Sequence, residues 1–131
     1  MREEIIIQSA AGIGAVILAG IAVFQILLLF GAPWGEYSWG GKYRGVLPRV
    51  HRWMCLPAAI LLILMAFVLL VHTDILAADL FPTGILVWVM TIFLGINTLG
   101  NAASRSRGER LVMTPLSGIC LLSCLLAAIF E

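Results

Sequence analysis

Long apolar stretches alternate with short polar segments along the whole chain. Four intervals contain no Asp, Glu, Lys or Arg: they run between Glu4 and Glu36, Arg52 and Asp74, Asp79 and Arg105, and Arg110 and Glu131. A helix needs about 20 predominantly apolar residues to cross a hydrocarbon core about 30 Å thick. The pattern therefore predicts an all-α membrane protein, folded as an antiparallel bundle of four transmembrane helices. The expected spans are residues 5–30, 53–71, 82–101 and 111–130, within one domain of residues 1–131.

The composition leaves little room for any other architecture. Hydrophobic residues make up 62% of the chain and charged residues 11%, whereas soluble domains are about 25% charged. The spans account for most of the 131 residues, so no separate soluble domain is expected. The net charge is only +1, and no basic run extends beyond the flanks of the spans. We therefore expect no nucleic-acid partner, and the lipid bilayer is the expected surrounding.

The charges of the connecting segments predict how the bundle is oriented in the membrane. Seven of the eight Lys and Arg residues lie in the first and third connections: Lys42, Arg44, Arg49, Arg52, Arg105, Arg107 and Arg110. The second connection contains Asp74 and Asp79 but no Lys or Arg. Short cytoplasmic loops accumulate Lys and Arg. We therefore expect residues 31–52 and 102–110 on the cytoplasmic side, and both termini outside.

Small residues mark one face of the first span. Ala11, Ala15 and Ala19 recur every four residues, which places them on one side of a helix where a neighbouring backbone can approach closely. Two interpretations follow from this face. It packs against the second or fourth span of the same chain, or it forms a seam between two copies of the protein. We favour packing within the chain.

Proline positions help to bound the first two spans. Pro33 follows the first span and keeps it from continuing as a helix. Pro57 is expected in the first turn of the second span, where a missing backbone N–H leaves no helical hydrogen bond unmade.

Residues 31–53 differ in composition from everything around them. They contain five glycines and an imperfect internal repeat, WGEY at 34–37 followed by WGGKY at 39–43. Trp and Tyr prefer the membrane–water interface, so an aromatic belt on the cytoplasmic side explains the rings. Glycines supply backbone conformations closed to other residues, and flexible linkers are rich in Ser and poor in aromatics. The segment therefore predicts an ordered re-entrant or interfacial loop.

Polar side chains from three expected spans meet near their cytoplasmic ends, beneath this loop. Asn97 and Asn101, for example, lie one turn apart on a single helix face. Polar residues at membrane depth usually face the bundle interior and mark sites or pathways. Eight residues are expected at this place: Gln25, Trp34, Glu36, Trp39, His51, Asn97, Asn101 and Ser117. They form either a pocket for a ligand or a structural hydrogen-bond network that holds the loop to the helices.

The sequence contains no recognisable catalytic or metal-binding motif. Cys55, Cys120 and Cys124 form no C-x-x-C pair, which disfavours a disulfide oxidoreductase. His51 and His72 are expected on opposite sides of the membrane, so they cannot share a metal or a haem within one chain. No H-x-E, G-x-S-x-G or phosphate-binding loop motif occurs. We expect no metal and no cofactor, and the sequence leans against an enzyme.

The first connection resembles a segment of other small membrane proteins. Residues 32–35 (APWG), 39–41 (WGG) and 47–48 (LP) are similar to an APWG…WGG…LP segment in a group of small bacterial four-span membrane proteins of uncharacterised activity. In that group the segment follows the first span. Outside residues 31–48 only the hydropathy profile is alike. The resemblance implies a multi-pass protein of the bacterial cytoplasmic (inner) membrane, and it brings no catalytic residue.

Three classes of function are compatible with these features. The first is binding or transport of a lipid-like or small amphipathic molecule at a pocket in the cytoplasmic leaflet. The second is a structural or accessory subunit of a membrane complex, in a homo-oligomer or with a partner membrane protein. The third is a lipid-modifying membrane enzyme in which Glu36 or His51 acts as acid or base. We expect the first.

Overall fold

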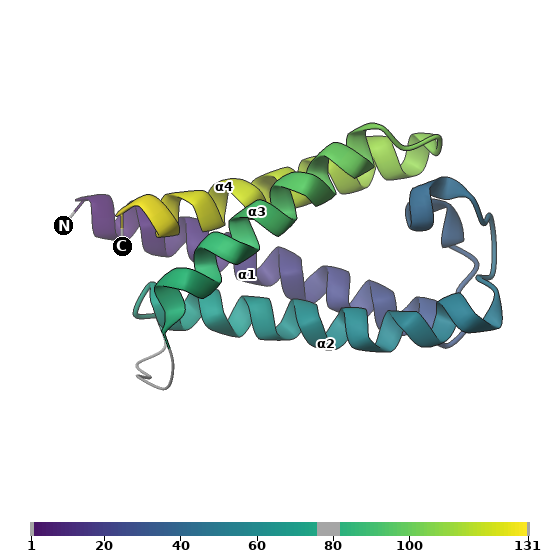
Figure 1. The fold of residues 1–131 in the computed structure, drawn as a ribbon, viewed down its shortest axis with the longest axis horizontal. Helices are drawn as coiled ribbons and strands as arrows, with labels where there is room; N and C mark the ends of the chain where they lie inside the picture. The colour runs from purple at the N-terminus through teal and green to yellow at the C-terminus, as the bar shows by residue number, and fades with distance from the viewer. Residues whose placement is uncertain (1, 76–81, 131) are drawn as a thin grey trace.

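The computed structural model describes residues 2–75 and 82–130, most of which are helical (Figure 1). The main elements are α1 (Arg2–Leu29), α2 (Arg49–His72), α3 (Thr83–Ala102), the π-helical turn η3 (Glu109–Met113) and α4 (Thr114–Phe130). Four helical segments, the last formed by η3 and α4 together, are long and apolar enough to cross a membrane. The predicted all-α bundle of four membrane-spanning helices is confirmed.

The chain folds as two helical hairpins that lie side by side (Figure 1). α1 packs along α2, α3 packs along α4, and contacts between α1 and α4 join the two hairpins. The chain termini, the end of α2 and the start of α3 lie at one end of the bundle, which we call the terminal end. The α1–α2 and α3–α4 connections lie at the opposite end, which we call the loop end. The antiparallel topology is as predicted.

Charge is distributed unequally between these two ends. The basic segments 31–52 and 102–110 lie at the loop end, whereas Asp74 lies exposed directly after α2 at the terminal end. Asp79, the other acidic residue of the second connection, lies outside the described residues. The side of the membrane that each end faces stays a prediction from the positive-inside rule.

The outer surface of the bundle is apolar. Large side chains such as Val16, Ile85 and Leu99 are exposed to 70% or more of their area. Soluble monomers rarely expose contiguous apolar patches larger than a few hundred Å². Helices suit a hydrocarbon environment because they satisfy their backbone hydrogen bonds internally. The surface therefore fits a multi-pass membrane protein.

The helices α1 and α4 pack closely where they present small residues to each other. A Cβ atom added to Gly14 would lie 2.7 Å from the Cβ of Ser123, and the Cys120 Sγ lies 3.7 Å from the Gly14 carbonyl oxygen. Ala11 and Ala15 are buried in the same core cluster as Cys120. The small face of α1 thus packs within the chain, as favoured from the sequence.

Side-chain hydrogen bonds tie the helices together at the terminal end. Gln8 Nε2 donates to the Thr73 carbonyl at 3.0 Å and joins α1 to the end of α2. The His72 ring reaches two other helices, with Nε2 3.1 Å from the Ala127 carbonyl and Nδ1 2.9 Å from Thr83 Oγ1. Because a carbonyl only accepts, Nε2 donates to it, and in the neutral ring Nδ1 then accepts from the Thr83 hydroxyl. His72 therefore has a structural role that links α2, α3 and α4.

The start of α2 differs from the predicted span. The helix begins at Arg49, one turn earlier than expected, because Pro48 occupies the N-cap position and its carbonyl accepts the Arg52 N–H at 2.9 Å. The prediction that Pro57 lies in the first turn is wrong, since it is the ninth residue of α2. The sequence analysis placed His51 in the loop, but it belongs to the first turn of α2.

Replacing Gly14 by alanine is expected to destabilise the bundle. The added methyl group needs space that Ser123 fills, and overpacking of this kind costs about 1–3 kcal/mol. Gly12→Ala is the matched control, because no atom lies within 4 Å of its added Cβ and alanine favours a helix by about 0.5–1 kcal/mol. Thermal unfolding in detergent should give a lower midpoint for Gly14→Ala only. Equal midpoints in the two variants would contradict the importance of this contact.

Candidate functional site

The connection between α1 and α2, residues 30–48, is an ordered structure that we call the aromatic loop. It contains two short 3-10 turns, η1 (Gly35–Tyr37) and η2 (Trp39–Gly41). The Gly35 N–H donates to the Gly45 carbonyl at 2.8 Å, which closes the loop on itself. Leu47 is buried against Leu28 and Cys55 and anchors the loop to α1 and α2. The connection is thus an ordered loop, and its re-entrant or interfacial position in the membrane stays a prediction.

Glycines allow the aromatic loop to lie directly against the α3–α4 connection. Gly41 has φ +75°, and a Cβ atom placed there would collide with the Cβ of Ser106. On the other side of the contact, a Cβ atom at Gly108 would lie 2.6 Å from the Tyr37 ring. Both positions thus need glycine for close approach, and Gly41 needs it also for its backbone conformation. The loop is held between the two hairpins by these contacts.

A polar cleft lies where the two hairpins and the aromatic loop meet. Its volume is about 430 Å³, and residues of α1, the loop, α3, η3 and α4 contribute to its wall. The lining residues are Ile21, Gln25, Tyr37, Ser38, Trp39, Asn97, Gly100, Asn101, Glu109, Met113 and Ser117. Large side chains such as Ile21 and Met113 replace the small residues of the terminal end, so α1 and α4 have no such close seam here. The cleft follows from this change in residue size along the two helices.

Hydrogen bonds fix the wall that α3 and α4 contribute. Asn101 Nδ2 donates to Ser117 Oγ at 3.1 Å, and the Ser117 hydroxyl donates to the Met113 carbonyl at 2.8 Å. Thr98 Oγ1 lies 3.1 Å from the same Ser117 oxygen and donates to the Leu94 carbonyl at 2.7 Å. Asn97 lies in the same wall and is exposed. This wall therefore contains a hydrogen-bond network that joins α3 to α4, and the exposed Asn97 amide lies beside that network.

Glu109 is a cleft residue that the sequence analysis missed. It is 4% exposed, although it lies in a segment expected to be a basic cytoplasmic loop. Ser106 caps the helix that follows, since its Oγ accepts the Glu109 N–H at 3.3 Å. The pattern S-x-x-E is that of a capping box and was the available signal for an earlier helix start. The Thr114 N–H then donates to the Glu109 carbonyl across a π-helical turn, which ends at Met113, two residues before Pro115.

Trp39 reaches the cleft from a strained backbone conformation. Its φ of +56° lies in the left-handed region, which costs a non-glycine residue on the order of 1–3 kcal/mol. The indole lies edge-on to the His51 ring with centroids 4.6 Å apart, and Tyr43 lies 4.6 Å from that ring. The Nδ1 atom of His51 is buried without a hydrogen-bond partner among the described residues. The stack holds the indole at the cleft in spite of the strain.

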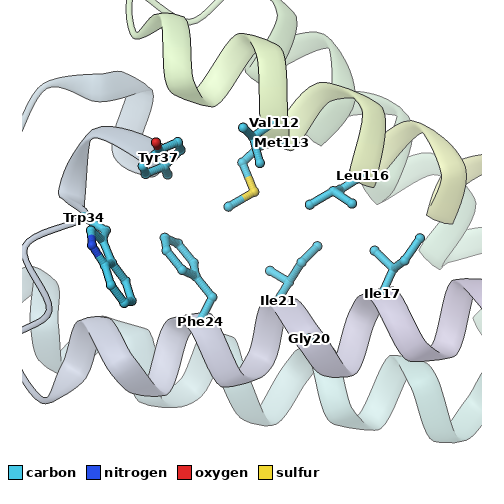
Figure 2. A pocket seen from close by; sticks show the side chains of 9 residues that line it. All are labelled: Ile17, Gly20, Ile21, Phe24, Trp34, Tyr37, Val112, Met113 and Leu116. Carbon is cyan, nitrogen blue, oxygen red and sulfur yellow. The ribbon is translucent and has the colours of Figure 1, made fainter.

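An apolar groove lies beside the cleft, between α1 and the η3–α4 segment (Figure 2). Its volume is about 520 Å³, and it is lined by Ile17, Gly20, Ile21, Phe24, Trp34, Tyr37, Val112, Met113 and Leu116. Trp34 and Tyr37 of the aromatic loop close one end, and the side chains of α1 and α4 point toward each other along its length. Ile17 to Phe24 spans about 10 Å of the α1 axis. Gly20 and Val112 are exposed, so the groove opens on the surface of the bundle.

Most of the predicted site residues come together, but not all. Five of the eight line the cleft: Gln25, Trp39, Asn97, Asn101 and Ser117. Trp34 lines the groove instead. Glu36 is half-buried in η1, and neither it nor His51 is among the residues that line the cleft or the groove. Whether any of the eight binds a ligand stays a prediction.

Comparisons of the chain with protein-family models, with curated proteins and with solved structures find no match. The resemblance of residues 31–48 to small bacterial four-span membrane proteins therefore also stays a prediction.

The substitution Gly41→Ala is expected to weaken the contact between the aromatic loop and the α3–α4 connection. The methyl group would meet Ser106 and would also disfavour the positive φ. Gly45→Ala is the matched control, because Gly45 has φ +79° but no atom within 4 Å of an added Cβ. Both variants incur a backbone cost of about 1–2 kcal/mol, and Gly41→Ala incurs a further steric cost of about 1–3 kcal/mol. The thermal unfolding midpoint should therefore fall further in Gly41→Ala, and the same midpoint in both would contradict this role of the contact.

Proposed function

We propose that this protein binds a lipid-like or small amphipathic molecule at the loop end of the bundle. The apolar part of the ligand occupies the groove between α1 and α4, and its polar part occupies the cleft. The observation that carries the proposal is that the two spaces are neighbours. They share the lining residues Ile21, Tyr37 and Met113, so one molecule with an apolar and a polar part can contact both walls.

The character of the two walls supports an amphipathic ligand. The groove is lined almost wholly by aliphatic and aromatic side chains, whereas amides, hydroxyls and one carboxylate line the cleft. Ligand sites are typically about 300–1,000 Å³ in volume, largely apolar with a few convergent polar groups. The volumes of about 520 Å³ and 430 Å³ lie in this range.

The location of the site follows from the charge distribution. Seven of the eight Lys and Arg residues lie in the two connections at the loop end. With the positive-inside rule, this supports a site in the cytoplasmic leaflet, with both termini on the other side. In a bacterium, as the resemblance implies, the membrane is the inner membrane. A ligand of this site enters sideways from the leaflet, because the groove opens on the apolar surface.

A structural or accessory subunit is the second candidate function. Trp34 and Trp39 are 43% and 39% exposed, and large exposed aromatics are enriched at protein interfaces. In that case the aromatic loop is the contact surface for a partner membrane protein or a second copy. Occupancy of the groove by an amphiphile separates the two functions. The lipid-modifying enzyme is the weakest of the three, because its candidate acid and base groups, Glu36 and His51, do not line the cleft.

Filling the groove is expected to weaken amphiphile binding. Leu116→Trp places a larger side chain in the groove, whereas Leu122→Trp adds the same indole to a residue of α4 that is 59% exposed and lines neither space. The probe is dodecyl maltoside, titrated into nanodisc-embedded protein and counted by native mass spectrometry. We expect the apparent affinity to fall at least tenfold in Leu116→Trp, about 1.4 kcal/mol, and to stay at the wild-type value in Leu122→Trp.

Two results would contradict the proposed binding of an amphiphile in the groove. If the wild-type protein retains no dodecyl maltoside, or if both tryptophan variants retain it as the wild type does, the proposed binding site is wrong. A bare protein in a fixed stoichiometric assembly would instead favour the accessory subunit.

A further inference from the structure

Glu109 gives the cleft a single formal charge. It is the only Asp, Glu, Lys, Arg or His among the described residues that line the cleft. Its side chain is 4% exposed, so bulk water does little to screen the carboxylate. The next residue, Arg110, directs its guanidinium to the Ser104 carbonyl at 2.9 Å and does not line the cleft. Glu109 is therefore the one acidic side chain among the described residues that line the cleft, although the loop end as a whole is basic.

The same cleft contains aromatic rings suited to a cation. Tyr37 and Trp39 both line it, and cations bind favourably over the faces of such rings at distances up to about 6 Å. Attraction between unit charges is several times stronger near a partly buried site than in water, because the effective dielectric constant is lower. An anionic headgroup would meet repulsion from Glu109 in the same surroundings. The Glu109 carboxylate and the rings of Tyr37 and Trp39 together favour a cationic headgroup over an anionic one.

The spacing on the last span connects this charge to the groove. Met113 follows Glu109 by four residues and lines both spaces, and Leu116 follows Met113 by three and lines the groove. Residues three or four apart lie on one side of a helix. When the headgroup lies beside Glu109, the apolar chain of the same molecule passes Met113 and extends toward Leu116. Figure 2 shows Met113 and Leu116 pointing into the groove opposite Ile21 and Ile17 of α1.

We propose that the ligand is a single-chain amphiphile with a cationic, ammonium-type headgroup, which Glu109 binds while the chain lies in the groove. This inference rests on the proposed function and narrows it to one class of ligand. Recognition is by charge and ring contact, and the amides of Asn97 and Gln25 accept hydrogen bonds from headgroups that carry N–H.

The test compares three probes with the same dodecyl chain: dodecyltrimethylammonium, dodecyl maltoside and dodecyl sulfate. Each is titrated into the full chain in nanodiscs of zwitterionic lipid and counted by native mass spectrometry. The wild-type protein should prefer the ammonium probe to the other two by at least tenfold. Glu109→Gln removes the charge but keeps the capping-box pattern, in which Gln serves as well as Glu. It should abolish the preference and retain dodecyl maltoside binding.

Two further variants complete the design. Glu36→Gln is the matched control, because it makes the same change in a half-buried loop residue that does not line the cleft, and the preference should persist. Asn97→Lys adds a positive charge to the cleft at an exposed position, and it should weaken binding of the ammonium probe at least tenfold. This second variant tests the inference even if Glu109→Gln does not fold.

The outcomes separate the two proposals. Equal binding of the three probes by the wild type, or a preference that survives both Glu109→Gln and Asn97→Lys, would overturn the cationic ligand and leave the amphiphile site intact. Failure of the wild type to bind any of the probes, or binding that Leu116→Trp does not change, would overturn the site itself.

Discussion

The close contact between α1 and α4 at Gly14 is the constraint on which the rest of the architecture depends. Lipid chains are as apolar as leucine, so helices in a membrane associate through tight packing and not through the removal of apolar surface from water. Gly14 and Ser123 permit this packing near the middle of α1. At the loop end, Ile21 and Met113 face the space between the same two helices, and the hairpins enclose a cleft there.

The aromatic loop makes use of the space that this arrangement leaves. Its glycines let the backbone lie against the α3–α4 connection, while its rings extend into the cleft and the groove. The contacts of the loop also keep the positive φ at Trp39, because an unconstrained loop would relax to a negative φ. A polar space closed by such a loop, with an apolar continuation toward the lipid, is a chemical environment suited to amphipathic molecules.

Much of the fold and part of the site could be predicted from the sequence. Charge-free intervals located the four spans, since a charged side chain in hydrocarbon is too costly to occur by chance. Asn97 and Asn101 were placed in the site because polar residues at that depth turn inward. Glu109 was missed because the charges of its connection were used only to infer topology. Attention to the S-x-x-E pattern at Ser106 would have moved the start of the last span and drawn notice to it.

By itself, the sequence determined the class of the protein, the number of its spans and the composition of its ordered loop. These properties depend on local features, namely hydropathy over about 20 residues and the backbone preferences of glycine and proline. Only the tertiary structure decided that Glu109 lines the cleft while Glu36 does not, and that Met113 lines both the groove and the cleft. Such relations depend on which helix faces meet and how closely they approach. Both are set by the size of side chains on two helices more than a hundred residues apart, as at Gly14 and Ser123.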